Sequence, residues 1–414
     1  MMVKRFLFIS FLFTFSSIIS QNQFRVMTYN ILNYPSKISS TRNPYFKSII
    51  DEVQPDILVV QEIESIAGVT EFHEQVLDST YGAGGFINGN DTDNAIFYKI
   101  ESFNFLSNIP VKTTLRDISQ FSMEYIPSGD TILVYSVHLK ASDGETERIR
   151  RQNEVINLRA VTDNLSSGSS FMVVGDFNIY YSNEPAFQEL IDDTNSGYFL
   201  DPIDKIGYWH NNSTYASVHT QSTRTRNLAD GGSSGGLDDR FDMILISQSI
   251  KDSGSVTYIP NSYTSYGNDG GHLNRNINDQ PNNIVSVDIA EALYRSSDHL
   301  PVFADFEIQE VVGIEDENTI INQFELHQNY PNPFNPTTTI KYSIPVVDVN
   351  LASTNVKLII YDVLGKEIQT LVNQKQQMGE YSVTFDASKL NSGVYFYKLQ
   401  FDGFVESKKM LLIK

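Results

Sequence analysis

Polar side chains recur at the points where short apolar runs of the chain end, and their types suit metal or phosphate chemistry. They are Asn30, Glu62, His138, Asp176, Asn178, Asp242 and the adjacent pair Asp298 and His299. Each alone has an ordinary structural explanation, such as a turn cap or a buried histidine. Their recurrence is harder to explain in that way, because an unpaired carboxylate at the end of a buried strand costs free energy. Since the ends of neighbouring strands face one crevice, we expect these side chains to form a ligand site.

The absence of cysteine narrows the chemistry of that site. With no cysteine in the chain, disulfides, thiolate metal sites, iron–sulfur clusters and cysteine nucleophiles are excluded. Carboxylate and amide oxygens are the ligands of a hard divalent cation. Such a cation stabilises charge on phosphoryl oxygens and lowers the pKa of a bound water. A carboxylate next to a histidine would hold the imidazole in one tautomer while the imidazole accepts a proton.

Short apolar runs and helical stretches must position these side chains. Strands are predicted at Phe24–Tyr29, Asp56–Gln61, Ala95–Tyr98, Thr131–His138, Phe171–Gly175, Phe241–Ile246 and Val302–Phe306. Helices are predicted at Pro44–Val53, Glu145–Leu165 and Glu184–Ile191. This order predicts a two-sheet α/β sandwich with helices on the outer faces. Charges of alternating sign predict a solvated, salt-bridged face on the longest helix, formed by Arg148, Arg151, Arg159, Glu147 and Glu154.

The composition is that of an acidic, folded chain with more than one domain. Its 414 residues are enough for two or three domains of about 100–200 residues each. A hydrophobic fraction of 41% is that of a globular protein. The formal net charge of −20 lies almost entirely in residues 21–308 and in the acidic stretch 309–323. This charge argues against polyanion binding through bulk electrostatics. It does not exclude a cleft that is locally basic or filled with metal ions.

The first 20 residues have the order of a secretory signal peptide. Lys4 and Arg5 precede an apolar run from Phe6 to Phe15, and small residues follow. The run is shorter than the roughly 20 apolar residues that span a bilayer, and no later segment is longer. A buried N-terminal helix is the alternative. Secretion is favoured, and a lipoprotein is excluded because lipidation needs a cysteine.

The C-terminal residues 324–414 are predicted to form a small all-β, immunoglobulin-like sandwich. Apolar residues alternate with polar ones, as at Ile340, Tyr342 and Ile344. Its motifs NYPNPFNPTTTIKYSIP, YDVLGKE, LNSGVYFYKL and KKMLLIK resemble the C-terminal sorting domains of type IX secretion. The resemblance implies contact with the type IX secretion machinery and export through the periplasm and outer membrane, to the medium or the cell surface. A plain immunoglobulin-like stalk is the alternative.

Residues 21–308 carry a second resemblance. The ordered motifs TYNIL, VVQE, VHLK, VGDFN, DRFDMIL and SDHLP are similar to those of the endonuclease/exonuclease/phosphatase family, which includes deoxyribonuclease I. The resemblance implies a four-layer α-β-β-α sandwich and a metal-dependent phosphoesterase. It assigns the binding of Mg²⁺ or Mn²⁺ mainly to Glu62, with Asn30 and Asp298 nearby.

The same resemblance assigns the catalytic roles. Asp176 would align or activate the attacking water, and Asn178 would bond a phosphate oxygen. His299, oriented by Asp242, would act as general base or stabilise the transition state. His138 would lie on the side of the phosphate or the leaving group.

The substrate is less well defined by the motifs. A flexible loop at 220–236 is expected to border the cleft and to supply positive charge through Arg224 and Arg226, although a solvated insertion is an equal alternative. His272 is expected to be a loop residue and not a metal ligand. The leading hypothesis is a secreted nuclease.

Other functions remain open at this stage. They are a sphingomyelinase-like phospholipase C with a membrane-contacting hairpin at Tyr258–Tyr266, a phosphomonoesterase, and an inactive surface-binding protein. A structural Ca²⁺ and the oligomeric state are also left open.

Overall fold

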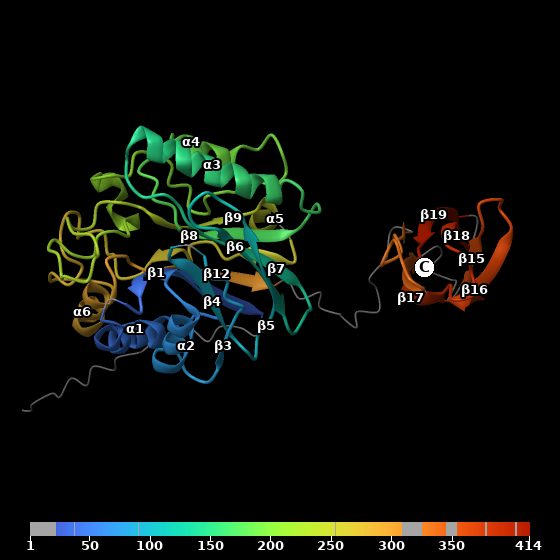
Figure 1. Ribbon diagram of the computed structural model, residues 1–414, viewed down its shortest axis with the longest axis horizontal. Coiled ribbons are helices and arrows are strands. Elements are labelled where there is room, and N and C mark those ends of the chain that lie inside the picture. Colours follow the sequence, from blue (N-terminus) through green and yellow to red (C-terminus); the bar gives the residue numbers. More distant parts are fainter. Residues whose placement is uncertain are drawn as a thin grey trace, which may run out of the picture. The chain divides into compact units, whose positions relative to one another are not determined.

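The computed structural model describes residues 22–308 except 37, 90 and 253, and residues 325–414 except 345–353, 377–378 and 402–403. The predicted signal peptide, 1–20, and the predicted linker, 309–323, lie outside the described residues. The chain forms two compact units, Met1–Val312 and Gly313–Lys414 (Figure 1). Each unit is described by itself.

The N-terminal unit contains two β-sheets. The first has the strand order β10-β12-β1-β2-β4-β3, with β11 beside β12. Its strands are β1 Gln23–Tyr34, β2 Ile57–Ile63, β3 Tyr81–Ala83, β4 Asp93–Lys99, β10 Val256–Tyr258, β11 Thr264–Ser265 and β12 Val302–Ile308. The second sheet has the order β5-β6-β7-β8-β9. Its strands are β5 Phe103–Val111, β6 Ile118–Tyr125, β7 Thr131–His138, β8 Ser170–Asp176 and β9 Asp242–Ile246.

Helices cover the outer face of each sheet (Figure 1). The helices are α1 Ser39–Val53, α2 Ile66–Gln75, α3 Glu145–Thr162, α4 Pro185–Ile191, α5 Gln248–Asp252, α6 Val287–Ser296 and the 3-10 helix η1 Ser213–Val218. Side chains alternate along each strand: Met27 packs with α1, α2 and α6, whereas its neighbour Val26 packs between the sheets. A third cluster joins the second sheet to α3 and α4. These layers confirm the predicted α-β-β-α sandwich.

A buried polar bridge crosses the core between the two sheets. Thr28 Oγ1 in β1 donates to Gln61 Oε1 in β2 over 3.2 Å. Gln61 Nε2 donates to Ser136 Oγ in β7, on the other sheet, over 3.1 Å. All three side chains are fully buried. The bridge ties the sheets together close to where Glu62 and His138 stand in the sequence.

Helix α3 differs from its predicted character. Only part of its charged face is solvated, since Arg151, Glu154 and Arg159 are buried. Arg151 forms an ion pair with Glu184 (Nη2 to Oε2, 2.7 Å), and Glu154 accepts a hydrogen bond from Lys140 N at 3.0 Å. The predicted salt bridges are present, but the prediction of solvation was wrong for these three residues because α4 packs on α3 and covers them. The pattern of charges could not show that cover.

The proposed membrane-contacting hairpin is also absent from the described structure. Residues 258–266 connect β10 and β11, which both pair with β12. Tyr258 and Tyr263 are partly buried and pack on the core between the sheets, and Tyr266 packs against the other core of the first sheet. The segment therefore offers no exposed aromatic tip to a lipid surface.

The C-terminal unit is a β-sandwich, as predicted. One sheet has the order β13-β14-β17 and the other β16-β15-β18-β19. The strands are β13 Glu325–Leu326, β14 Thr337–Ile344, β15 Thr354–Tyr361, β16 Glu367–Gln376, β17 Gly379–Asp386, β18 Gly393–Phe401 and β19 Phe404–Leu412. Ile340, Tyr342 and Ile344 lie in the core between the sheets, which confirms the period-two pattern.

Candidate active site

The topology brings the predicted polar residues together at one edge of the sandwich. β1 and β2 are parallel, and so are β7 and β8, so each pair ends on the same side. The register places His138 beside Asp176 and Asp176 beside Asp242. A pocket of about 270 Å³ opens here. It is lined by Glu62, His138, Asp176, Asn178, Asp298 and His299, and Asn30 and Asp242 contact these residues from behind.

Glu62 is fixed at the end of β2 by its backbone and by two hydrogen bonds. Its φ of 62° lies in the left-handed region, which is costly for a residue with a side chain. Its Oε1 accepts from Asn30 Nδ2 at 3.0 Å, and its Oε2 accepts from Asn33 N at 2.9 Å. Burial, together with the charge of Asp298, raises the pKa of Glu62. The carboxylate is therefore held in place but is short of positive charge.

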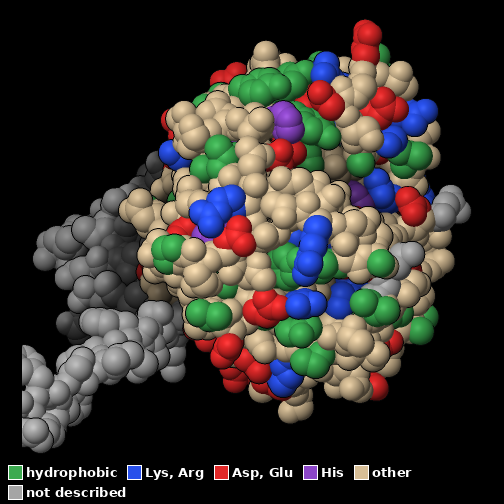
Figure 2. All heavy atoms as spheres, turned by 90° about the vertical axis from the view of Figure 1, so that its left-hand side faces the viewer, with side chains coloured by type: hydrophobic (Ala, Val, Ile, Leu, Met, Phe, Trp, Pro, Cys, Tyr) green, Lys and Arg blue, Asp and Glu red, His purple; other side chains and the backbone are tan. Residues whose placement is uncertain are grey.

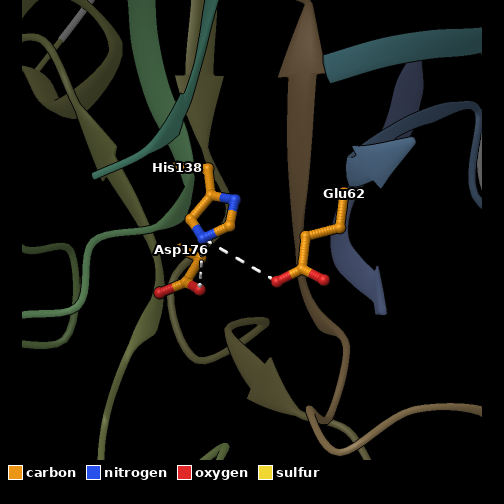
Figure 3. A group of neighbouring side chains, drawn as sticks. All are labelled: Glu62, His138 and Asp176. Atoms are coloured by element: carbon orange, nitrogen blue, oxygen red, sulfur yellow. Dashed lines mark ion pairs between the residues drawn. The ribbon is translucent and has the colours of Figure 1, made fainter. Parts of the chain in front are cut away.

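His138 faces two carboxylates across the pocket (Figure 3). Its Nε2 lies 3.6 Å from Asp176 Oδ2 and 3.8 Å from Glu62 Oε1. Burial lowers the pKa of His138 well below its ordinary value, with a further contribution from Arg116. The imidazole is thus neutral at neutral pH. Ligand atoms of Glu62, His138 and Asp176 lie within 4.8 Å of one another, a spacing that could hold one ion.

Asp176 lies at the end of β8, where the two parallel strands approach closely. The preceding residue is Gly175, and a Cβ there would lie 2.1 Å from Val137 O, so only glycine fits. Asp176 Oδ1 accepts from Asn178 N at 3.0 Å, and Oδ2 accepts from Asn30 Nδ2 at 3.1 Å. Burial raises the pKa of Asp176 to about 7.

His299 and Asp242 form the predicted dyad. His299 Nδ1 lies 2.8 Å from Asp242 Oδ2, and both side chains are buried. Burial opposes a charged imidazole, but the carboxylates of Asp242 and Asp176 raise the pKa of His299 well above its ordinary value. The second ring nitrogen, Nε2, lies 3.8 Å from Asp176 Oδ2. The dyad therefore holds His299 with one nitrogen toward the pocket carboxylates.

Gln221 is a pocket residue that the sequence did not reveal. Its Nε2 lies 2.6 Å from His299 Nε2 and donates to Asp298 Oδ2 at 3.2 Å. Asp298 Oδ2 also accepts from Ser233 N at 2.6 Å. Gln221 belongs to the loop 220–236, which borders the pocket as expected through Gln221, Gly231 and Ser233. No apolar run or motif distinguishes Gln221 from the other residues of this loop. Its backbone pairs with Asp239 and His299, which brings it to the site.

The residues of the site fit a hard divalent cation. Asp298 Oδ1 is buried and has no hydrogen-bond partner among the described residues. The pKa values of Glu62 and Asp176 are raised, mainly by burial. A cation that prefers oxygen ligands stabilises the charged form of buried carboxylates of this kind. Asn30 turns its amide nitrogen toward Glu62 and Asp176, while its oxygen accepts from Leu32 N at 3.0 Å.

The two arginines predicted to border the cleft have different surroundings. Arg224 is fully buried and forms an ion pair with Asp230 (Nη1 to Oδ2, 2.8 Å). Arg226 donates from Nε to Tyr294 Oη at 2.9 Å, on α6. The expected substrate-binding role of Arg224 is wrong, because its guanidinium is buried and already paired with Asp230, six residues further along the chain. Arg226 is exposed and does not line the pocket, so its substrate-binding role stays a prediction.

The loop that contains His272 uses this histidine for structural contacts. His272 is buried, with Nδ1 2.9 Å from Asp269 Oδ1 and Nε2 2.9 Å from the carbonyl oxygen of Asp279. It does not line the pocket. This agrees with the expectation that His272 is a loop residue and not a metal ligand.

Comparisons with known proteins agree with this geometry. Residues 27–299 match the model of the endonuclease/exonuclease/phosphatase family, and residues 328–414 match the secretion system C-terminal sorting domain. No curated protein sequence matches the chain.

Several solved structures resemble the chain. An endonuclease/exonuclease/phosphatase family protein from Bacteroides thetaiotaomicron is 16% identical, with a TM-score of 0.47 over 70% of this chain and 96% of that one. A mannosyl-6-phosphatase from the same organism is 17% identical, with a TM-score of 0.46 over 68% and 99%. D. rerio TDP2 in complex with a single-strand DNA product is 14% identical, with a TM-score of 0.46 over 69% and 99%.

The match of the tail also gives the destination of the protein. A type IX sorting domain makes this a secreted or cell-surface protein. No helix in the described part of the chain is both long and apolar enough to cross a membrane. The family match spans well over half of the chain, and its members are hydrolases of phosphoester bonds. The chain thus belongs to the endonuclease/exonuclease/phosphatase family and carries a C-terminal sorting domain for type IX secretion.

Proposed function

We propose that the protein is a secreted phosphodiesterase that depends on Mg²⁺ or Mn²⁺ and hydrolyses nucleic acid. One observation carries the proposal. The carboxylates of Glu62, Asp176 and Asp298 share a pocket of about 270 Å³ with His299, which Asp242 orients at 2.8 Å. A protein that only binds a surface has no need of this combination.

Three residues would hold the cation. They are Glu62, whose carboxylate is fixed by Asn30 and Asn33, Asp298, whose Oδ1 is without a partner in the described structure, and Asn30, once its amide oxygen is turned toward them. The bound cation supplies charge stabilisation for the phosphoryl oxygens and a lower pKa for water.

The remaining residues act on the water and the phosphate. Asp176 orients the water that attacks phosphorus, since its Oδ2 faces the pocket between His138 and His299 at 3.6 and 3.8 Å. His299 accepts a proton or stabilises charge on a phosphate oxygen, and Asp242 keeps its Nε2 turned toward the pocket. Asn178 keeps one amide hydrogen for a phosphate oxygen while the other bonds Leu139 O at 3.2 Å. Neutral His138 lies on the side of the phosphate or leaving group.

The surface favours nucleic acid over lipid, and a flexible strand over a duplex. The segment proposed to contact membranes, 258–266, packs on the core. On the face shown in Figure 2, Lys and Arg side chains are interspersed with Asp and Glu and form no continuous basic surface. Because affinity for a stiff duplex comes largely from phosphate contacts, we expect weak, salt-sensitive binding to double-stranded DNA.

The test is hydrolysis by the full chain of five substrates: single-stranded DNA, duplex DNA, RNA, sphingomyelin and a sugar phosphomonoester. Each is assayed with Mg²⁺ and with EDTA, and in parallel with His299→Ala. We expect metal-dependent cleavage of nucleic acid and its loss in the variant. Turnover of the lipid or the monoester alone would overturn the nuclease assignment, and activity that survives EDTA would overturn the mechanism.

A further inference from the structure

Two stacked tyrosines stand beside the catalytic pocket and have no role in the chemistry described above. The rings of Tyr181 and Tyr208 lie 5.4 Å apart with only 7° between their planes. The guanidinium carbon of Arg148 lies 5.3 Å from the centre of the Tyr181 ring. Tyr208 is 55% exposed. We call Arg148, Tyr181 and Tyr208 the tyrosine platform.

The tyrosine platform adjoins the pocket at two points. Tyr180, the residue before Tyr181, lines the pocket. Ser142 lines it as well, and the next residue, Asp143, forms an ion pair with Arg148 (Oδ1 to Nη2, 2.8 Å). The tyrosine platform is therefore linked to the rim of the pocket through Tyr180 and through Asp143.

The platform is held in place by the backbone and by buried charges. Tyr181 and Tyr208 pair through a β-bridge, and Ser182 N donates to Gly207 O at 2.8 Å. Glu184, which is buried in its ion pair with Arg151, accepts from Tyr180 N at 2.9 Å. A ring that is exposed yet preorganised loses little conformational freedom on binding a ligand.

We propose that the tyrosine platform is a subsite that stacks an unpaired nucleobase next to the phosphodiester under attack; the inference rests on the proposed nuclease function. Because Tyr208 is 55% exposed, its ring is accessible to another planar π-system. Aromatic residues bind the bases of single strands in this way with little preference for sequence. A base in a duplex is already stacked and paired, so the subsite selects single strands or frayed ends.

The planarity of the stack is the reason to prefer a base over a sugar ring. Nearby polar groups are largely used within the protein: His210 Nδ1 bonds Asp239 Oδ1 at 2.8 Å, and Asn212 Nδ2 donates to Tyr208 O at 2.8 Å. A sugar would need such groups for its hydroxyls, whereas a base can bind through its face alone.

The experiment compares two single-stranded oligonucleotides that differ at one nucleotide beside the cleaved phosphate. One oligonucleotide has a normal base at this nucleotide, and the other has an abasic analogue in its place. The enzymes are the wild type, Tyr208→Ala, Tyr208→Trp and the control Tyr198→Ala, whose side chain lines a separate cavity. We expect the wild type to prefer the base. Tyr208→Ala should raise KM for that substrate about tenfold or more and cleave the abasic one as the wild type does. Tyr208→Trp should retain the preference.

The outcomes separate the subsite from the proposed function. If the wild type cleaves both oligonucleotides equally well, or if Tyr208→Ala retains the full preference, the subsite is disproved while the nuclease function stands. If the wild type cleaves neither oligonucleotide but hydrolyses a sugar phosphate with a KM that Tyr208→Ala raises, the platform binds a sugar and both proposals fail.

Discussion

His299 Nδ1 and Asp242 Oδ2 lie 2.8 Å apart in a buried setting, and they come from segments 57 positions apart in the sequence. Asp242 begins β9 in the second sheet, whereas His299 stands just before β12 in the first. The dyad thus joins the two sheets at the pocket. Its geometry depends on the whole sandwich and not on any local motif.

The first prediction concerns this dyad. Asp242→Asn should lower turnover by about 10²–10⁴-fold, because it loses the carboxylate that orients and charges the imidazole. The measurement is steady-state hydrolysis with circular dichroism as a check of folding. Asp51→Asn, at an exposed ion pair with Lys47, serves as the control. Turnover in Asp242→Asn equal to that of the wild type would refute the role of the dyad.

A second prediction concerns the cation. Glu62→Gln should weaken Mg²⁺ binding, because an amide replaces the carboxylate that Asn30 and Asn33 hold in the pocket. Isothermal titration calorimetry with Mg²⁺ measures this directly, without an activity assay. EDTA should abolish turnover and added Mg²⁺ or Mn²⁺ should restore it. Unchanged Mg²⁺ affinity in Glu62→Gln would remove Glu62 from the metal site.

Arg224 provides a third prediction, one of stability. Arg224→Ala leaves Asp230 buried without its cation, so the free energy of unfolding should fall by roughly 3–5 kcal/mol. Denaturation in urea measures the loss. Arg275→Ala, which breaks the exposed pair with Asp279, should cost about 1 kcal/mol or less. A variant of normal stability that binds nucleic acid poorly would instead restore the substrate role first expected for Arg224.

The fourth prediction is a pH dependence that arises away from the pocket. Burial raises the pKa of Asp56 from 3.8 to about 6, although its Oδ2 accepts from Arg25 N at 2.7 Å. The folded state therefore holds this proton more tightly than the unfolded chain. The contribution of protonated Asp56 to the free energy of unfolding is fully present below pH 3.8 and is lost as the pH rises through about 6. In Asp56→Asn this loss should be missing, which urea denaturation at several pH values would show. Identical pH profiles for the two proteins would contradict the shift.

Export gives a fifth prediction. Deletion of residues 324–414 should leave the catalytic unit in the periplasm, since it removes the sorting domain but leaves the N-terminal unit whole. Cell fractionation with an immunoblot measures the location. Substitution of Leu364, which is 89% exposed, by alanine is the control for a folded tail. Detection of the deletion variant in the culture medium would contradict the role of residues 324–414 in export.

Most strands of the N-terminal unit and most residues of the pocket could be predicted from the sequence, for a physical reason. Buried strands read as apolar runs, and a polar residue at the end of such a run is conspicuous, as at Glu62 and Asp176. Helices α2 and α6 and strands β5 and β6 were not predicted, although the shorter helix α4 was. Gln221 and Tyr208 could not be found, since each lies in a loop whose path depends on distant pairing. The substrate role expected for Arg224 was wrong because the sequence does not show that Asp230 forms a buried ion pair with it.

The bridge from Thr28 through Gln61 to Ser136 has a consequence for how such an enzyme adapts. Glu62 directly follows Gln61, the middle residue of this bridge, and His138 lies two residues beyond Ser136, which is one of its ends. The separation of Glu62 and His138 across the pocket is therefore set in part by packing between the two sheets. Laboratory evolution confined to pocket residues would sample only part of the available variation, because altered side-chain volume in the inter-sheet core can widen or narrow the reaction chamber without touching a substrate.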